Sequence, residues 1–315
     1  MPTLFENGDH LARVIPHRRA GADPANNPPA AALILGCRLK ALRESLGLTQ
    51  TAAVRNTGFS NSTLSRLERG ESPPEEIDVR ALARRYNMVA HEEAQLMQLA
   101  AQARRPVWWS RYLEPTAGYL TTFIGLEEAA RRIDTYEALV VPGVLQTEAY
   151  ARDMIERHFL SSEQDKVELA VGLRMERKRR FLDSPPELAS ILISEFVLQP
   201  LVEDKSVMAG QMLHLHAMAL TPGIKLRVVP MARIIGLQMA SITHLEFDAG
   251  GPPPMIYLEG YESADYRPKA TGVAGGRNNG ADYERHLQLL VKMKARAATR
   301  FQSMRLIESA VERYS

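Results

Sequence analysis

Residues 48–70 read LTQTAAVRNTGFSNSTLSRLERG, and this stretch decides the fold of the first part of the chain. Thr49 is a favoured N-cap residue, so a short helix is expected to begin there and to stop at Gly58. Ser60 is a second N-cap candidate, and the helix after it ends at Gly70. The stretch therefore predicts two short helices that are joined by a tight turn.

The second of these helices has two different faces. Phe59 precedes the cap and Leu64 lies inside the helix, which is the spacing of a hydrophobic staple. Leu64 and Leu67 fall on one face and are expected to point inward. The polar residues on the outward face are Asn61, Ser62, Ser65, Arg66 and Arg69.

Helices are also expected on both sides of this pair. Leu35, Leu39 and Leu42 follow helical spacing, which predicts a helix over about 31–45 that ends before Gly47. After the prolines at 73 and 74, a further helix is expected to run to about residue 86. We therefore predict a mainly α domain over residues 31–104.

The outward face of the second helix suits contact with double-stranded DNA. Short polar side chains at the start of a helix allow close approach to base edges and phosphates. Arg66 can donate two hydrogen bonds to a guanine, and Asn61 can pair with an adenine. Gln50 lies at the start of the preceding helix, where free amides suit a phosphate. The alternative is a solvated helical face that binds nothing.

The same residues resemble the XRE family of phage-repressor-type regulators, whose domain is lambda-repressor-like. The matching positions are Leu48, Thr49 and Gln50, then Ser60, Ser62, Leu64, Ser65, Glu68 and Gly70. The resemblance implies a DNA-binding helix-turn-helix and a structural ion pair between Arg43 and Glu68. The basic excess over residues 31–90 is modest, so DNA binding is expected to need a homodimer or the basic N-terminal arm. Ala53 and Thr57 depart from the family, which has larger apolar residues there. We predict as DNA-facing residues Gln50, Thr51, Ser60, Asn61, Ser62, Thr63, Ser65, Arg66 and Arg69.

The remainder of the chain mixes two periodicities. Residues 1–30 lack sustained periodicity and are expected to form a flexible arm. A proline at 106 breaks the helical pattern, so a second domain is placed over 105–315, with Trp108 and Trp109 packing the linker onto it. Helices are expected near residues 124–138, 145–158, 163–181, 204–220 and 281–311. Strands are expected over 188–194, 224–229, 242–247 and 255–259, which together indicate an α+β domain; a loop is expected over 271–280.

This second part resembles the DUF5753 domain, also called Scr1-type antitoxin-like, of many actinobacterial regulators. The resemblance rests on Glu127, Ala130 and Tyr136, on PGVLQT at 142–147 and on YAR at 150–152. It implies a small DUF397-type partner protein. The PGVLQT motif is interpreted either as a structural corner or as part of a ligand pocket or partner surface. The basic run at 174–180 is interpreted as a solvated helix face, or else as a second DNA or acidic-partner contact.

Composition excludes several classes of protein. The net charge of +2 over 315 residues is not that of a polycation, so DNA binding must come from local clustering. The single cysteine cannot form an internal disulfide or a cysteine-rich zinc site, and no cofactor or metal is expected. No catalytic string and no membrane-spanning run is present, so neither an enzyme nor a membrane protein is expected.

We therefore predict a cytoplasmic, nucleoid-associated transcriptional regulator. Its C-terminal domain is expected to bind a small partner protein. Two alternatives stay open: a regulator that responds to a small-molecule effector, and a scaffold that has lost DNA binding. A cavity of roughly 300–1,000 Å³ would favour the small molecule, and a flat exposed apolar patch would favour the partner protein.

Overall fold

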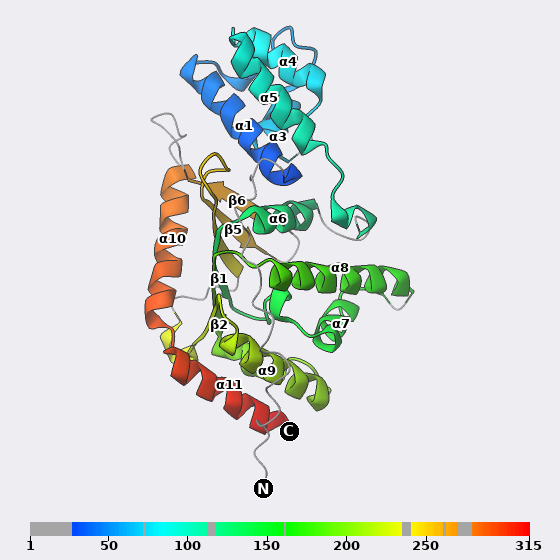
Figure 1. Ribbon diagram of the computed structural model, residues 1–315, viewed down its shortest axis with the longest axis vertical. Coiled ribbons are helices and arrows are strands. Elements are labelled where there is room, and N and C mark those ends of the chain that lie inside the picture. Colours follow the sequence, from blue (N-terminus) through cyan, green and yellow to red (C-terminus); the bar gives the residue numbers. More distant parts are fainter. Residues whose placement is uncertain are drawn as a thin grey trace.

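The computed structural model describes residues 27–71, 74–112, 118–160, 162–234, 241–260, 263–269 and 279–315. The predicted arm lies outside the described residues up to position 26, and the predicted loop lies outside them over 271–278. The described chain has a cluster of helices at its N-terminal side and a sheet covered by helices in the remainder (Figure 1). This arrangement confirms the predicted fold class, a mainly α domain followed by an α+β domain.

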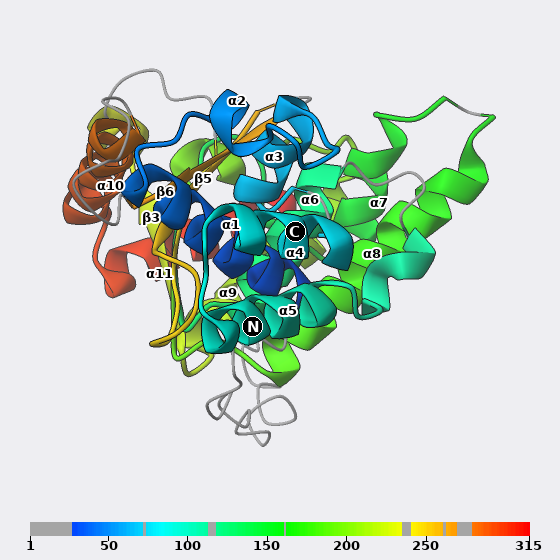
Figure 2. The ribbon, with the colours of Figure 1, turned by 90° about the horizontal axis from the view of Figure 1, so that it is seen from above.

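Short helices around a shared apolar core build the N-terminal part. They are α1 (Pro28–Ser45), α2 (Gln50–Ala53), α3 (Asn61–Glu68), α4 (Glu76–Arg85) and α5 (Ala90–Ala103). Helix α1 contacts both α3 and α5, which lie on opposite sides of it (Figure 2). The core includes the buried leucines 35, 39, 64, 67, 82 and 96. Leucines 35, 39, 64 and 67, whose spacing predicted α1 and α3, are therefore core residues.

The ends of these helices follow local capping rules. Thr49 accepts a hydrogen bond from the Ala52 N–H at 3.2 Å, and Ser60 accepts one from the Thr63 N–H at 3.1 Å. Both predicted N-caps are thus confirmed. Gly70 ends the α3 segment at φ +67°, a left-handed conformation that favours glycine.

Two predicted helix boundaries are wrong. Helix α1 begins at Pro28 instead of residue 31, because Asn27 caps it and prolines suit a first helical turn. Helix α2 ends at Ala53 and does not continue to the predicted stop at Gly58. Asn56 and Gly58 both have positive φ, at 63° and 87°, and a right-handed helix cannot continue through them. Helix α5 was not identified from the sequence as a separate helix.

The C-terminal part alternates helices and strands. Its helices are α6 (Gly118–Ala129), α7 (Glu148–Glu156), α8 (Gln164–Asp183), α9 (Lys205–Leu220), α10 (Asn279–Arg296) and α11 (Arg300–Tyr314). Its strands are β1 (Arg132–Glu137), β2 (Leu188–Ser194), β3 (Ile224–Val229), β4 (Ser241–Glu246), β5 (Met255–Glu259) and β6 (Ala264–Pro268). Short 3-10 turns are η3 (Trp108–Tyr112), η4 (Gly143–Leu145), η5 (Glu195–Leu198) and η6 (Met231–Arg233).

The six strands form one mixed sheet in the order β3-β2-β1-β4-β5-β6. Strands β1, β2 and β3 are parallel, while β4, β5 and β6 pair antiparallel. Helix α10 covers one face, and α6 and α8 lie on the other (Figure 1). Ile133, Ile191 and Leu245 pack in the main core of the α6 face, whereas Tyr136 and Leu192 pack against α10.

The strands over 188–194, 224–229 and 255–259 are confirmed, and β4 is shifted by one residue from its prediction. The predicted helix over 124–138 is wrong after Ala129, because residues 132–137 form the central strand β1. The predicted helix over 281–311 is two helices, since Thr299 caps α11 in a capping box with Gln302. Strand β6 was not predicted.

The first helix and the C-terminal part are in contact. Ala30 and Leu33 of α1 belong to the same apolar cluster as Phe123 and Leu126 of α6. At Gly125 of α6 the two helices approach so closely that a Cβ atom would lie 2.3 Å from the Pro29 ring. Helix α1 therefore contacts two elements: its first turns pack on α6, and it also packs against α3.

The two tryptophans pack on the C-terminal part, as the sequence predicted. Trp109 is buried in a cluster with Ile124 and Leu173. Trp108 donates a hydrogen bond from Nε1 to Glu128 at 2.9 Å, and the Arg180 guanidinium lies 4.6 Å from the centre of its ring.

Candidate functional site

Helix α3 presents a polar face to solvent. Asn61, Ser62 and Arg66 are exposed, whereas Leu64 and Leu67 are buried behind them. This is the division of faces that the sequence predicts for a helix that reads DNA.

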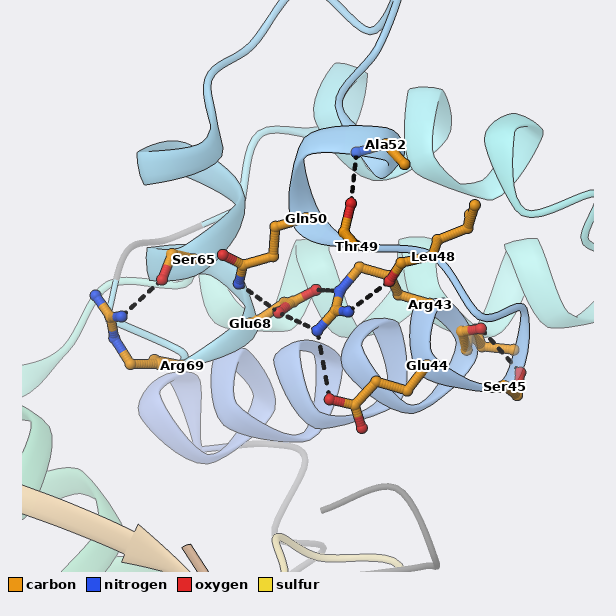
Figure 3. Close-up of polar contacts among 11 residues, drawn as sticks. Arg43, Glu44, Ser45, Leu48, Thr49, Gln50, Ala52, Ser65, Glu68 and Arg69 are labelled. Carbon is orange, nitrogen blue, oxygen red and sulfur yellow. Dashed lines mark hydrogen bonds and ion pairs between the residues drawn. The ribbon is translucent and has the colours of Figure 1, made fainter. Parts of the chain in front are cut away.

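A buried ion pair fixes α3 to α1 (Figure 3). Arg43 donates from Nε to Glu68 Oε1 at 2.5 Å and from Nη2 to Glu68 Oε2 at 3.1 Å. It also donates from Nη1 to the Leu48 carbonyl at 2.8 Å. The hydrogen bond to Glu68 raises the pKa of Arg43, although burial opposes the shift. Since the two side chains are 9% and 3% exposed, the pair is desolvated and orients α3 firmly.

Gln50 joins the same network. Its Nε2 atom donates to Glu68 Oε2 at 2.9 Å, so the half-buried Gln50 amide connects α2 to α3 (Figure 3). Thr51 lies next to it and is exposed, and its hydroxyl accepts a hydrogen bond from Asn61 Nδ2 at 2.8 Å. Two predicted DNA-facing residues therefore contact each other across the helix pair.

Several of the remaining predicted DNA-facing residues are engaged in hydrogen bonds within the chain. Ser60 and the half-buried Thr63 are occupied by the N-cap, where their hydroxyls are 3.1 Å apart. Arg69 makes two hydrogen bonds to Glu71, at 2.5 and 2.8 Å, and one to the Ser65 hydroxyl at 2.7 Å. Its charge is thus partly neutralised by Glu71.

Arg66 is in a different situation. Within the described parts of the chain it has no hydrogen-bond or ion-pair partner, and its side chain is exposed in the last turn of α3. Arg55 is also exposed, in the turn that follows α2, and its place in the sequence did not indicate a role in binding. The early end of α2 is the feature that places Arg55 in this turn.

The C-terminal part contains a cavity of about 610 Å³ on the α6 face of the sheet. Its wall is formed by α6, α8, the PGVLQT segment and strands β1, β2, β4 and β5. Phe123, Ile133, Phe181 and Ile191 supply apolar surface. The size and the mixed lining are typical of sites for small molecules.

The PGVLQT segment is both a structural corner and part of this cavity. Gln146 donates to the Val141 carbonyl at 2.8 Å and accepts a hydrogen bond from Arg174 at 2.6 Å. Thr147 caps α7, and Gln211 of α9 donates to the Leu145 carbonyl at 2.9 Å. The two interpretations left open for this motif are therefore compatible.

The basic run at 174–180 is not a fully solvated helix face, which corrects that interpretation. Arg174 and Arg177 line the cavity, and Lys178 donates to the Gln146 carbonyl at 2.7 Å. Arg177 makes two hydrogen bonds to the buried Glu127, at 2.7 and 2.9 Å. Burial alone would lower the pKa of Arg177, but the Glu127 carboxylate raises it overall.

Two carboxyl groups at strand ends also line the cavity. Burial raises the pKa of Glu137 to about 7; the Ser241 hydroxyl, 2.8 Å away, opposes the shift, and Glu259 adds to it. The native state therefore holds this proton more tightly than the unfolded chain, so stability falls as pH rises from the ordinary glutamate pKa towards 7. The sequence indicates Arg174 only as part of the basic run at 174–180, and it assigns neither Glu137 nor Glu259 to a site.

No helix among the described residues is long and apolar enough to cross a membrane. The same residues contain no group of three or more metal-ligating side chains that could hold an ion.

Comparison with known families assigns both parts of the chain. Residues 34–96 match a helix-turn-helix domain, and residues 120–309 match the domain of unknown function DUF5753. Neither description names an enzymatic activity. The chain shows no significant similarity to curated proteins or to solved structures. The helix-turn-helix match supports a DNA-binding regulator, and, because the second match spans more than half of its length, the chain belongs to the DUF5753 family.

Proposed function

We propose that the chain is a transcriptional regulator that recognises a specific DNA sequence with the exposed face of α3. The observation that carries the proposal is the exposure of Ser62 and Arg66 on a helix that the Arg43–Glu68 pair holds in place. A rigid helix with short polar residues at its start and an arginine one turn later suits the major groove. A cytoplasmic, nucleoid-associated location is part of this proposal.

Arg66→Ala is expected to weaken specific DNA binding by roughly 1–3 kcal/mol, because Arg66 would lose its paired hydrogen bonds to a guanine. Fluorescence anisotropy with a fragment selected from genomic DNA measures this loss. Arg69→Ala is the matched control. It removes the same charge from the C-cap of the same helix, but Glu71 already binds that guanidinium, so the loss should be smaller. Equal affinity of Arg66→Ala and the unmodified chain would remove Arg66 from base recognition.

A second candidate function, response to a small molecule, is favoured by the cavity of about 610 Å³. Helix α6 lines this cavity with Leu120, Phe123 and Glu127, and its Gly125 contacts Pro29 of α1. A ligand that shifts α6 would therefore act on the helix that supports α3. The DUF397-type partner protein, the homodimer and membership of the XRE family stay predictions from the sequence.

A further inference from the structure

The sheet face that forms the cavity wall carries hydroxyl and carboxyl side chains at one end. Thr135 and Thr243 are paired across β1 and β4, and their hydroxyls are 2.8 Å apart. One row further along, Ser241 of β4 is the register partner of Glu259 of β5 and hydrogen-bonds to Glu137 of β1. Since side chains two residues apart share one face of a strand, these hydroxyl and carboxyl groups form one polar end of the cavity.

Three charged groups at this end, Arg174, Glu137 and Glu259, have no counter-ion at ion-pair distance among the described residues. Arg177 is neutralised by Glu127, but among the described residues no ion pair within 4.0 Å joins Arg174 to Glu137 or to Glu259. Within the same residues the Glu259 carboxylate has no hydrogen-bond partner, and the Arg174 side chain hydrogen-bonds only to Gln146. These groups nevertheless influence one another electrostatically: Glu259 and Glu137 act on Arg174, whose pKa burial lowers to about 10.

Half-buried charges that face a cavity without counter-ions are costly to the fold. They become favourable when a ligand supplies the opposite charges in the space between them. The two carboxyl groups suit an ammonium group, and the remaining donors of Arg174 suit a carboxylate. The other side of the cavity is apolar, with Phe123, Phe181 and Ile191 exposed to it.

We propose that this cavity binds a small zwitterion with an apolar body, of the kind represented by an apolar amino acid or a short apolar peptide. Its ammonium group lies at Glu137 and Glu259, and its carboxylate lies at Arg174. The apolar body packs between α6 and the sheet.

Ligand binding at this site is also expected to affect DNA binding, an inference that rests on the proposed function. Phe123 and Glu127 of α6 line the cavity, and Gly125 between them contacts Pro29 of α1. Occupation of the cavity therefore changes the surface on which α1 rests, and α1 in turn contacts α3.

Three related probes test the site without DNA: leucyl-phenylalanine, its N-acetyl form and its C-terminal amide. At about 5 mM and near pH 7, leucyl-phenylalanine should raise the melting temperature of the full chain by about 2–4 °C. The acetylated form lacks the cation and should give little or no shift, and the amide should give an intermediate one. No shift with any probe, or equal shifts with the free and acetylated forms, would overturn the proposal.

Single substitutions test which residue binds each charged group of the ligand. Glu259→Gln should remove the preference for the free ammonium group over the acetylated form, and Arg174→Met should remove the preference for the carboxylate over the amide. Glu284→Gln, on the exposed side of α10, is the matched control and should keep both preferences. If the variants discriminate among the probes as the unmodified chain does, the assignment of the charges is wrong.

Glu137→Gln separates loss of binding from loss of folding. Above pH 7 this variant lacks a carboxylate whose ionisation destabilises the fold, so its melting temperature should equal or exceed that of the unmodified chain. It should nonetheless bind leucyl-phenylalanine at least tenfold more weakly. Unchanged binding would remove Glu137 from the site. If the dipeptide binds but leaves DNA affinity unchanged, the site stands and the route through α6 is wrong.

Discussion

Arg43→Ala is expected to destabilise the N-terminal helices by about 3–5 kcal/mol, the largest effect among the substitutions considered. The change leaves the Glu68 carboxylate buried without its cation, and such a charge costs far more than the ion pair contributed. The variant also loses the hydrogen bond to the Leu48 carbonyl. Scanning calorimetry of the full chain should show the transition of these helices at a clearly lower temperature.

Two further variants test whether the unpaired Glu68 charge causes the loss of stability in Arg43→Ala. Glu44→Ala removes a more exposed partner that lies 3.4 Å from Arg43, so it should cost less than about 1 kcal/mol. The double variant Arg43→Met with Glu68→Leu should be more stable than Arg43→Ala, because it leaves no unpaired buried charge. A melting profile of Arg43→Ala that matches the unmodified chain would contradict the structural role of the pair.

Gly36→Ala is expected to destabilise the same helices by about 1–3 kcal/mol and to weaken DNA binding with them. A Cβ atom at Gly36 would lie 2.4 Å from the Leu67 carbonyl oxygen and 2.7 Å from that of Glu68. Both atoms belong to the backbone of α3, so α3 itself must move. Chemical denaturation and DNA titration of the variant measure the two effects.

The matched control is Gly210→Ala. Gly210 is exposed within helix α9, and an added Cβ atom there meets nothing within 4 Å. The substitution should stabilise the chain by roughly 0.5–1 kcal/mol, since alanine is the better helix former. If both glycine variants stabilise the chain, α1 and α3 do not approach as closely as the structure has them.

The helix pair around α3 could be predicted from the sequence because its signals are local. The N-cap at Ser60, the leucines at 64 and 67 and the glycine at 70 lie within a few turns of one another. Strand β1 could not be predicted in this way, because its buried polar residues find their partners far along the chain. Asp134 contacts Lys294 of α10 at 2.7 Å, and Thr135 contacts Thr243 of β4.

For the same reason the DNA-facing site could be predicted from the sequence and the cavity site could not. The DNA-facing residues stand on one short helix, so a single stretch of sequence indicates them together. The cavity charges come from α8, β1 and β5, and only the sheet register brings Glu137 and Glu259 into one row, on either side of Ser241 of β4. The partners of the basic run at 174–180, Glu127 and Gln146, lie on other elements. The run alone therefore predicted a solvated helix face.

The dependence of DNA affinity on salt tests most directly whether α3 binds DNA. The full chain is incubated with genomic fragments, and the affinity for the most enriched fragment is measured from low to physiological salt. A protein that contacts several phosphates should lose affinity by about a hundredfold over this range, with a linear slope of log affinity against log salt. A chain that enriches no fragment, or binds one with no dependence on salt, would show that the polar face of α3 does not bind DNA.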